Sequence, residues 1–326
     1  MTFMTRVAWV ESPLQLVNAV EYAASTGEPL RIYLRAHSKQ LQYTVDVLSP
    51  HLPEGVKIAG AWPLAYLSPF VVARERLIGD GYSGQFRLAV ALTGVRDLVV
   101  VDDGSAMLSF AEQVRERLPL SRHGRRERWY ARRLGAIAAA RLHRTLATGG
   151  LSVFSAYSDG DELLALEAAG ATIVHNRYRW VRKTKFVKDD NAMRIVVLGS
   201  ALHDDGFVKG GPYRDWVRDQ VAAGAGVYFP HRREKGKSLK RFKDHEGLKV
   251  RKAVLPIEIV LASSRELTTV ITLPSSVVAT LRNILPEEVE LRVSPVPEEW
   301  FTKKADDALR STLRRVANPR AAREFA

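Results

Sequence analysis

The sequence predicts an α/β protein made of two Rossmann-like domains, with parallel sheets that face a central cleft. Short apolar segments rich in Val and Ile alternate with longer segments of helical periodicity along the 326 residues. A basic segment without clear periodicity, 177–191, interrupts this alternation and is predicted to be a linker. The length also favours two domains over one. We therefore expect domains at 1–188 and 189–326, with a C-terminal helix free to pack back on the first domain.

The first half of the chain is predicted to hold six strands. Ser12 followed by Pro13 is a strong helix-start pattern, because serine caps a helix and proline suits its first position. The most apolar strand, 98–101, consists of one Leu and three Val, as expected of a strand buried on both faces. The predicted strands are 6–10, 30–34, 56–59, 98–101, 151–154 and 171–174, and the predicted helices are 13–24, 38–48, 71–77, 105–118 and 129–146.

The second half repeats the alternation on a smaller scale. It opens with the apolar run from Ile195 to Leu198, followed by Gly199 and Ser200. The predicted strands are 194–198, 226–230, 258–261, 268–273 and 290–293, and the predicted helices are 213–223, 275–281 and 303–316. Parallel strands joined by helices account for this order in both halves.

Composition and charge narrow the function classes. The absence of cysteine excludes disulfides, thiolate metal sites and thiol catalysis. The first ten residues lack the apolar core of a signal peptide, and no apolar run reaches the ~20 residues of a membrane span, so a cytoplasmic protein is expected. Asp159-Gly160-Asp161 has the form of an Asp-x-Asp metal motif but lies at a predicted helix start, so no metal is expected.

The net charge of +13 is concentrated in three stretches. Residues 122–144 hold eight Arg and one Glu, 177–188 hold six basic residues and no acid, and 232–252 hold ten basic residues and three acids. A solvated basic surface is the simplest explanation of this charge. An anionic membrane surface is the next, which would make the protein peripheral on the inner face of the membrane. Nucleic acid is not expected, because no recognition motif accompanies the charge.

Asp102 and Asp103 follow the strand 98–101 directly, and Gly104 permits a sharp turn after them. Ligands bind outside the carboxyl ends of strands in open α/β sheets, so a carboxylate there can serve as a general base. Successive strand residues point to opposite faces, so one Asp can enter the cleft while the other holds the turn. An Asx-turn made by both residues is an equally good explanation.

Two further strand ends carry groups suited to a phosphate. His231, followed by Arg232 and Arg233, ends the strand 226–230, and a protonated histidine or a bidentate arginine binds phosphate well. Ser275 and Ser276 open a predicted helix, whose free N–H groups and partial positive charge attract anions. A charged surface loop and ordinary helix capping are the competing explanations, and each is favoured on local evidence alone.

Taken together and in this order, these segments resemble the bacterial sialyltransferases of the lipooligosaccharide sialyltransferase and polysialyltransferase types. Ser12-Pro13-Leu14-Gln15 is similar to the Ser/Thr-Pro-Leu-Gln opening of that group, and Asp102-Asp103-Gly104 to its acidic-acidic-Gly motif. His231 corresponds to the His of its His-Pro motif, and Ser275-Ser276 to its Ser-Ser/Thr motif. The resemblance spans most of the chain. Arg232 departs from it, because the family has proline at that position.

The resemblance implies a GT-B fold and an inverting transfer of a nonulosonic (sialic-type) acid from a CMP-activated donor to a glycan or glycolipid hydroxyl. It implies no metal and no other cofactor. Asp102 would deprotonate the acceptor, and His231 would bind the CMP phosphate or protonate it as it leaves. The remaining implied roles are phosphate binding by Ser275 and Ser276, ribose binding by Glu258, and a place near the sugar or acceptor for Ser12, Gln15, Asn18, Asp103 and Gly104. Arg232, which the resemblance does not account for, is expected to add a positive charge at the donor and so to favour an anionic leaving group.

Two other functions stay open at this point. A GT-B transferase with a different donor, CMP-Kdo or a UDP-sugar, is compatible with the loss of the proline. A non-catalytic protein that binds an anionic membrane or polymer through a transferase fold is the third. The joint presence of Asp102, His231, Glu258, Ser275 and Ser276 speaks against this last function, because an inactive site need not keep them all.

Overall fold

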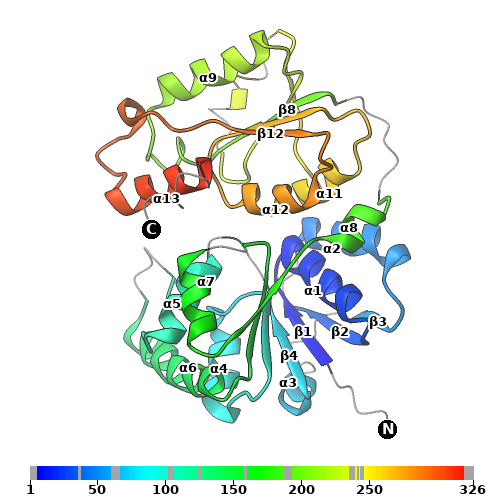
Figure 1. Cartoon of the computed structure of the whole chain (residues 1–326), viewed down its shortest axis with the longest axis vertical. Helices are drawn as coiled ribbons and strands as arrows, with labels where there is room; N and C mark the ends of the chain where they lie inside the picture. The colour runs from blue at the N-terminus through cyan, green and yellow to red at the C-terminus, as the bar shows by residue number, and fades with distance from the viewer. Residues whose placement is uncertain are drawn as a thin grey trace. The chain divides into compact units, whose positions relative to one another are not determined.

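The computed structural model divides into two compact units, Met1–Phe186 and Val187–Ala326, each built around one parallel sheet (Figure 1). The structure describes residues 6–35, 38–59, 67–101, 104, 106–122, 127–157, 160–186, 193–234, 239–240, 242 and 246–318. Within these residues no helix is both long and apolar enough to cross a membrane.

The first unit contains a seven-stranded sheet in the order β3-β2-β1-β4-β5-β6-β7, with every neighbouring pair parallel. Its strands are β1 (Arg6–Val10), β2 (Leu30–Leu34), β3 (Val56–Ala59), β4 (Glu75–Ile78), β5 (Leu98–Val101), β6 (Leu151–Ser155) and β7 (Thr172–His175). Its helices are α1 (Pro13–Thr26), α2 (Lys39–Leu48), α3 (Leu67–Val72), α4 (Gly84–Thr93), α5 (Ala106–Arg115), α6 (Trp129–Ala147), α7 (Asp161–Ala168) and α8 (Arg179–Lys183), with a 3-10 turn at Ser49–His51.

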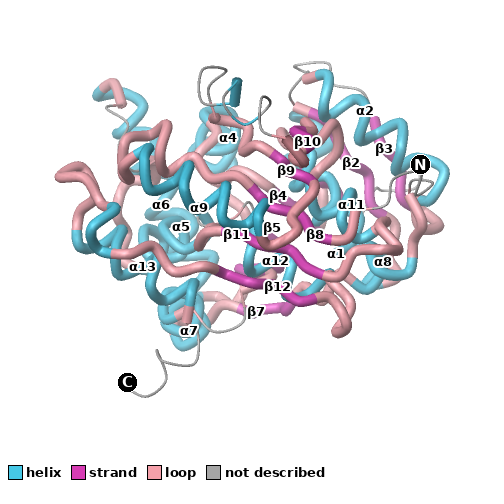
Figure 2. Tube along the Cα trace, turned by 90° about the horizontal axis from the view of Figure 1, so that it is seen from above, coloured by secondary structure: helices cyan, strands magenta, loops and turns pink. Residues whose placement is uncertain are grey.

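The second unit contains a five-stranded parallel sheet in the order β10-β9-β8-β11-β12. Its strands are β8 (Ile195–Leu198), β9 (Val227–Phe229), β10 (Lys249–Val250), β11 (Thr269–Thr272) and β12 (Glu290–Val293). Its helices are α9 (Gly210–Ala222), α11 (Ile257–Ala262), α12 (Val277–Ile284) and α13 (Asp307–Ala317), with a 3-10 turn at Glu298–Trp300. α12 lies against β12 (Figure 2). The prediction of two α/β halves with parallel sheets is therefore confirmed.

Buried apolar side chains form the core of each unit, as the strand sequences predicted. All four residues of β5 are buried, in agreement with its apolar sequence. Ser12 caps α1 by accepting a hydrogen bond from the Gln15 N–H (3.3 Å), and the helix ends at Gly27, whose φ of 69° suits glycine.

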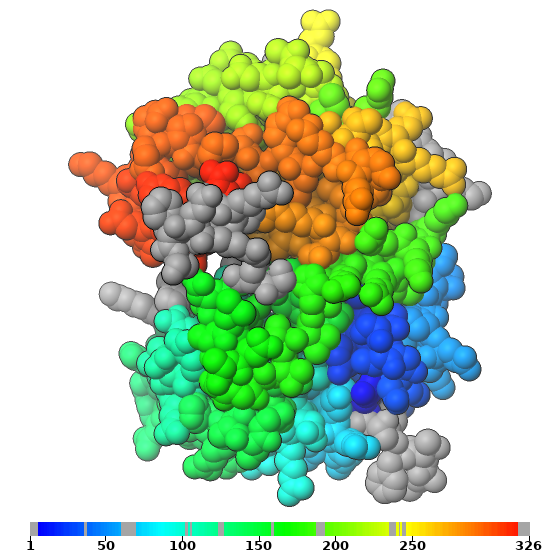
Figure 3. Space-filling view, viewed as in Figure 1, coloured from blue at the N-terminus to red at the C-terminus, as the bar shows by residue number. Residues whose placement is uncertain are grey.

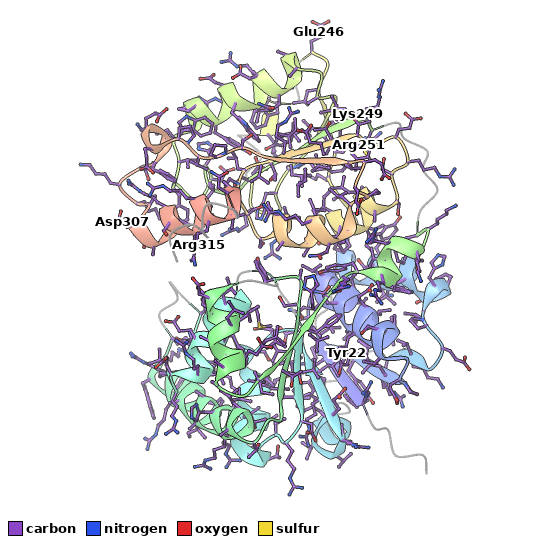
Figure 4. All side chains as sticks on the ribbon, in the orientation of Figure 1. Tyr22, Glu246, Lys249, Arg251, Asp307 and Arg315 are labelled. Atoms are coloured by element: carbon purple, nitrogen blue, oxygen red, sulfur yellow. The ribbon has the colours of Figure 1, made fainter. Side chains whose placement is uncertain are left out.

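β4 corrects the predicted helix at 71–77. Residues 75–78 form a strand between β1 and β5, and the helix α3 ends before it. The four-residue segment Glu-Arg-Leu-Ile has no strand pattern of its own, and its strand conformation comes from pairing on both sides. Tyr22 on α1 reinforces this position, because its hydroxyl donates to the Glu75 Oε1 (3.2 Å) (Figure 4). The helix α4, which follows β4, was not predicted.

α8 corrects part of the predicted linker 177–191. Residues 179–183 form a helix that belongs to the first unit. The buried carboxylate of Glu21 on α1 accepts hydrogen bonds from the N–H groups of Trp180 (2.9 Å) and Val181 (3.0 Å). A carboxylate at a helix start replaces the missing intrahelical acceptors. A side chain distant in sequence therefore stabilises this short helix, which no local pattern predicts.

α13 packs on its own unit through Leu309 and Leu313, which join Val208 and Phe301 in one apolar cluster. The space-filling view shows this red segment against the orange part of the same unit (Figure 3). Asp307 lies in its first turn and Arg315 in its last (Figure 4), the arrangement that the helix dipole favours.

Replacing Glu21 with Ala should lower the free energy of unfolding by about 1–3 kcal/mol, because two backbone donors lose their buried acceptor. Urea denaturation of Glu21→Ala beside Glu28→Ala, an exposed control expected to change stability by less than about 0.5 kcal/mol, measures the difference. Equal stability of the two variants would contradict the anchoring role of Glu21.

Candidate functional site

Three strand ends meet at one edge of the second sheet. β9, β8 and β11 are neighbours, and the carboxyl ends of parallel strands lie at the same edge. The loops that leave this edge carry His231 after β9, Gly199 and Ser200 after β8, and Ser275 and Ser276 after β11. The sheet therefore gathers the predicted phosphate-binding residues of this unit at one place.

A buried carboxylate that the sequence did not single out organises this edge. Glu234 Oε2 accepts a hydrogen bond from the His231 N–H (2.6 Å), and its Oε1 accepts one from the Tyr228 hydroxyl (2.6 Å). The Tyr213 hydroxyl on α9 lies 2.8 Å from that of Tyr228 and accepts from the Ser200 N–H (2.9 Å). Glu234 thus links the loop after β9 to the loop after β8.

The network has no room for a side chain at the end of β8. A Cβ atom at Gly199 would overlap Glu234 Oε2, and it would approach the Tyr228 hydroxyl to 2.5 Å. Burial raises the pKa of Glu234 to about 7, although hydrogen bonds from Tyr228 and from the His231 N–H favour its charged form. Burial also raises the phenol pKa values of Tyr213 and Tyr228 well above their ordinary value.

His231 is held in a defined state. Burial lowers the pKa of its imidazole, and the charges of Arg233 and Arg232 lower it further. Its Nδ1 accepts a hydrogen bond from the Arg233 N–H (3.2 Å), so the neutral ring carries its proton on Nε2. In this tautomer the ring presents its Nε2–H to an anion as a hydrogen-bond donor.

The two arginines after His231 differ in their surroundings. Arg233 pairs with Asp205 in the loop after β8 (2.8 Å), which adds a second link between the two loops. Arg232, at the position where the resembling family has proline, has an exposed side chain. An exposed arginine beside His231 adds positive charge to this edge.

Ser275 and Ser276 stand at the start of α12. Ser276 is the N-cap residue, but its side chain makes no capping hydrogen bond, and it is exposed. Ser275 is half-buried. The competing explanation of these serines as ordinary side-chain caps therefore does not apply to Ser276. A helix of eight residues begins here with backbone donors and a hydroxyl side by side, an arrangement that suits an anion.

Glu258 lies in the first turn of α11, not in the predicted strand 258–261. The run Ile-Glu-Ile-Val-Leu-Ala is short and apolar, which suits a buried strand and a buried helix equally, and Pro256 before it favours the helix. The side chain is buried, its Oε1 accepts from the Thr280 hydroxyl on α12 (3.1 Å), and burial raises its pKa. Glu258 therefore lies against the helix that Ser275 and Ser276 open.

The predicted catalytic carboxylates of the first unit, Asp102 and Asp103, lie outside the described residues. The strand before them is present as β5, and Gly104 after them adopts φ 80°, the left-handed conformation expected of a glycine turn. The helix α5 follows from Ala106. The strand–turn–helix context predicted for the acidic pair is thus confirmed, and the role of either Asp stays a prediction.

The polar residues of the α1 turn have structural partners. Gln15 is buried, and its Oε1 accepts from the Glu11 N–H (2.7 Å). Asn18 is fully buried and accepts a hydrogen bond from Asn176 after β7 (3.3 Å). Both side chains therefore hold the first unit together, and a place near sugar or acceptor remains a prediction for them and for Ser12.

A cluster of charged residues that the sequence did not single out lies at the carboxyl edge of the first sheet, where β1, β2 and β4 end. Glu11 pairs with Arg35 (2.7 Å), and Arg35 also donates to the Ser83 hydroxyl (2.6 Å). Asp80 pairs with Arg122 (2.7 Å). Burial is the largest influence on Glu11 and raises its pKa, against the opposing effect of Arg35. Glu11 and Arg35 directly follow predicted strands, so their position could have identified them, whereas Asp80 follows the strand that was mistaken for a helix.

The described residues contain no group of three or more His, Asp or Glu side chains suited to hold a metal ion. The residues at both edges are donors and charged groups suited to oxyanions and hydroxyls. The residues at the second sheet can bind an anionic group, and the first sheet carries the half-buried carboxylates of Glu11 and Asp80.

Replacing Gly199 with Ala should lower the free energy of unfolding by about 1–3 kcal/mol, because the added methyl group displaces Glu234. Gly211→Ala is the matched control, since a Cβ there meets nothing within 4 Å. Urea denaturation of both variants gives the comparison. A Gly199→Ala protein as stable as Gly211→Ala would show that the network is not tightly packed.

The pKa of Glu234 predicts a pH-dependent stability. The carboxyl titrates near 4.5 when unfolded and near 7 when folded, so between these values the folded state holds the extra proton. Its contribution is present below pH 4.5 and is lost as the pH rises through 7. Wild-type stability should therefore fall by up to about 3 kcal/mol relative to Glu234→Gln between pH 5 and pH 8. Urea titrations at several pH values measure this, with the exposed Glu287→Gln as control; parallel curves for wild type and Glu234→Gln would contradict the raised pKa.

Comparisons with known proteins agree with this architecture. No protein-family model matches the chain, and no curated protein matches it in sequence. Among solved structures it is similar to an α/β-galactoside α-2,3-sialyltransferase from the luminous marine bacterium Photobacterium phosphoreum, with TM-score 0.55 and 10% identity over 98% of this chain and 97% of that one. A weaker match, with TM-score 0.37 and 13% identity over 98% of this chain and 100% of that one, is the E. coli heptosyltransferase WaaC. At these identities the likeness shows the fold alone, and the chain has a two-domain fold of the GT-B glycosyltransferase type.

Proposed function

We propose that the protein is an inverting glycosyltransferase that moves a nonulosonic acid from a CMP-activated donor to a glycan hydroxyl without a metal. The observation that carries the proposal is the carboxyl edge of the second sheet. The strands before His231 and Ser275 end at this edge, and Glu258 on α11 bonds to Thr280 of α12, the helix that Ser275 and Ser276 open. The fold similarity to a sialyltransferase and the family-like order of these motifs support it.

The proposed reaction needs a general base and a group that stabilises the leaving phosphate. Asp102 takes the proton of the acceptor hydroxyl, whose oxygen forms a bond to the anomeric carbon from the face opposite the phosphate. The bond between that carbon and the phosphate oxygen breaks, and its electron pair leaves with CMP. The products are the glycoside and CMP, with the proton on Asp102.

The leaving phosphate is the charge that the second unit has to stabilise. A neutral His231 donates from Nε2, and Ser275, Ser276 and the first turn of α12 donate to the remaining oxygens. Glu234 acts through His231 as a positioning residue, because it holds the histidine backbone and never needs to touch the donor. The resemblance assigns the ribose hydroxyls to Glu258, whose side chain is buried beside Thr280.

CMP release with CMP-Neu5Ac, CMP-Kdn or CMP-Kdo, each with and without a galactoside acceptor and with EDTA present, tests the function. We expect acceptor-dependent release with a nonulosonic acid donor that EDTA does not reduce. Asp102→Ala should lower kcat about 10²–10⁴-fold, and His231→Ala about 10²–10³-fold. The exposed Asp46→Ala is the control and should keep full activity.

The other outcomes separate the alternatives. Loss of activity in Asp103→Ala but not in Asp102→Ala would identify Asp103 as the general base. Turnover only with CMP-Kdo or a UDP-sugar would keep the transferase and change its donor. Saturable CMP binding without turnover would contradict the proposed identity of the donor sugar or of the acceptor. The absence of both binding and turnover would overturn the transferase proposal.

A further inference from the structure

An arginine-rich pocket lies in the first unit, at the edge of the sheet opposite Glu11 and Asp80. The pocket has a volume of about 580 Å³ and is formed by the last turns of α4 and α6 and by the segments that precede β4 and β5. Its charged lining consists of five arginines and one aspartate, namely Arg74, Arg76, Arg96, Arg141, Arg144 and Asp97. This excess of positive charge would attract an anionic group.

The helix ends account for only part of this charge. The carboxyl ends of α4 and α6 each carry roughly half a negative charge. Together with Asp97 they balance about two of the five arginines. No ion pair joins Arg74, Arg96 or Arg144 to a carboxylate of the described chain, and the three side chains are exposed. About three positive charges are therefore left for an outside partner.

Exposed aliphatic side chains border the same pocket. Leu92 is 68% exposed and directly precedes Thr93 of the lining, and Val72 is 69% exposed and directly precedes Ala73. Leu88, one turn before Leu92 on α4, and Ile137, one turn before Arg141 on α6, are 46% and 45% exposed. α4 and α6 pack side by side (Figure 1). Arg141 on α6 donates to the Val90 carbonyl on α4 (3.3 Å). The aliphatic groups and the arginines thus share one surface.

We propose that this surface, formed by α4, α6 and the arginine pocket, binds the headgroup region of an anionic phospholipid membrane. Lipid phosphates would neutralise the arginines, while Leu88, Leu92, Val72 and Ile137 would enter the boundary of the acyl chains. Basic residues combined with exposed leucines are the composition of membrane-surface helices, and each binding arginine adds to the attraction of an anionic leaflet.

The aliphatic residues decide between a membrane and a nucleic acid. Nucleic-acid surfaces combine positive charge with polar and aromatic side chains that contact sugars and bases. Leucine, valine and isoleucine side chains offer a polyanion no hydrogen bond and no charge. Their transfer from water into a bilayer is favourable. Glu11 and Asp80, at the opposite edge of the same sheet, are not part of this surface.

Vesicle co-sedimentation of the full chain tests the proposal independently of any transferase activity. The probes are neutral phosphatidylcholine vesicles and vesicles that contain about one third phosphatidylglycerol. We expect at least tenfold stronger binding to the anionic vesicles, weakened by added salt. Arg74→Gln/Arg96→Gln/Arg144→Gln should lower this binding about a hundredfold, since each charge is worth about fivefold. The same charge change in the exposed Arg177→Gln/Arg179→Gln/Arg182→Gln control should lower it far less.

A second test variant with a matched control measures the contribution of the aliphatic side chains. Leu88→Ser/Leu92→Ser should weaken vesicle binding at least tenfold, whereas Leu118→Ser/Leu164→Ser, at similarly exposed positions, should not. Far-ultraviolet circular dichroism of every variant verifies folding. Equal effects of test and control variants would overturn the proposal. Vesicle binding that does not depend on the leucines and that inorganic phosphate or duplex DNA abolishes would also overturn the proposal. The pocket would then bind phosphate or nucleic acid alone.

Discussion

The carboxylate of Glu234 is the interaction on which the candidate site depends. It is buried, it accepts from the His231 backbone and from Tyr228, and it fills the space that Gly199 leaves open. A buried carboxylate is costly unless every oxygen has a donor, so the surrounding geometry is tightly specified. The position of His231, the conformation of the loop after β9 and the absence of a side chain at the end of β8 all follow from it.

The same constraint explains the state of His231. The Arg233 N–H donates to Nδ1 only because the loop turns back on itself, and that turn is fixed where Glu234 holds the His231 N–H. Burial and, after it, the two neighbouring arginines lower the pKa of the ring. The histidine therefore meets an anion through a directed hydrogen bond, while the arginines and the start of α12 supply the positive potential.

Charge is distributed differently at the two edges of the first sheet. At the carboxyl edge Glu11 pairs with Arg35 and Asp80 pairs with Arg122, so the charges of these four described residues balance one another. The arginines of the opposite edge exceed their carboxylates, and aliphatic side chains lie beside them. Paired charges suit a sugar with many hydroxyls, and unpaired ones suit an extended anionic surface. Part of the positive charge of the chain is therefore gathered at one edge of this sheet, which composition could not show.

The sequence by itself determined the alternation of strands and helices, two parallel sheets, and the strand ends that carry Gly104, His231 and Ser275. These features follow from hydrophobic periodicity and from turn and capping residues, which act over a few positions. Only the tertiary structure decided that residues 75–78 form a strand, that residues 257–262 form a helix and that Glu21 holds α8. It also decided that Glu234 meets Tyr213, Tyr228 and Gly199. The physical reason is that short segments take their conformation from the partners they pair with, and a buried network joins residues whose separation in sequence carries no periodic pattern.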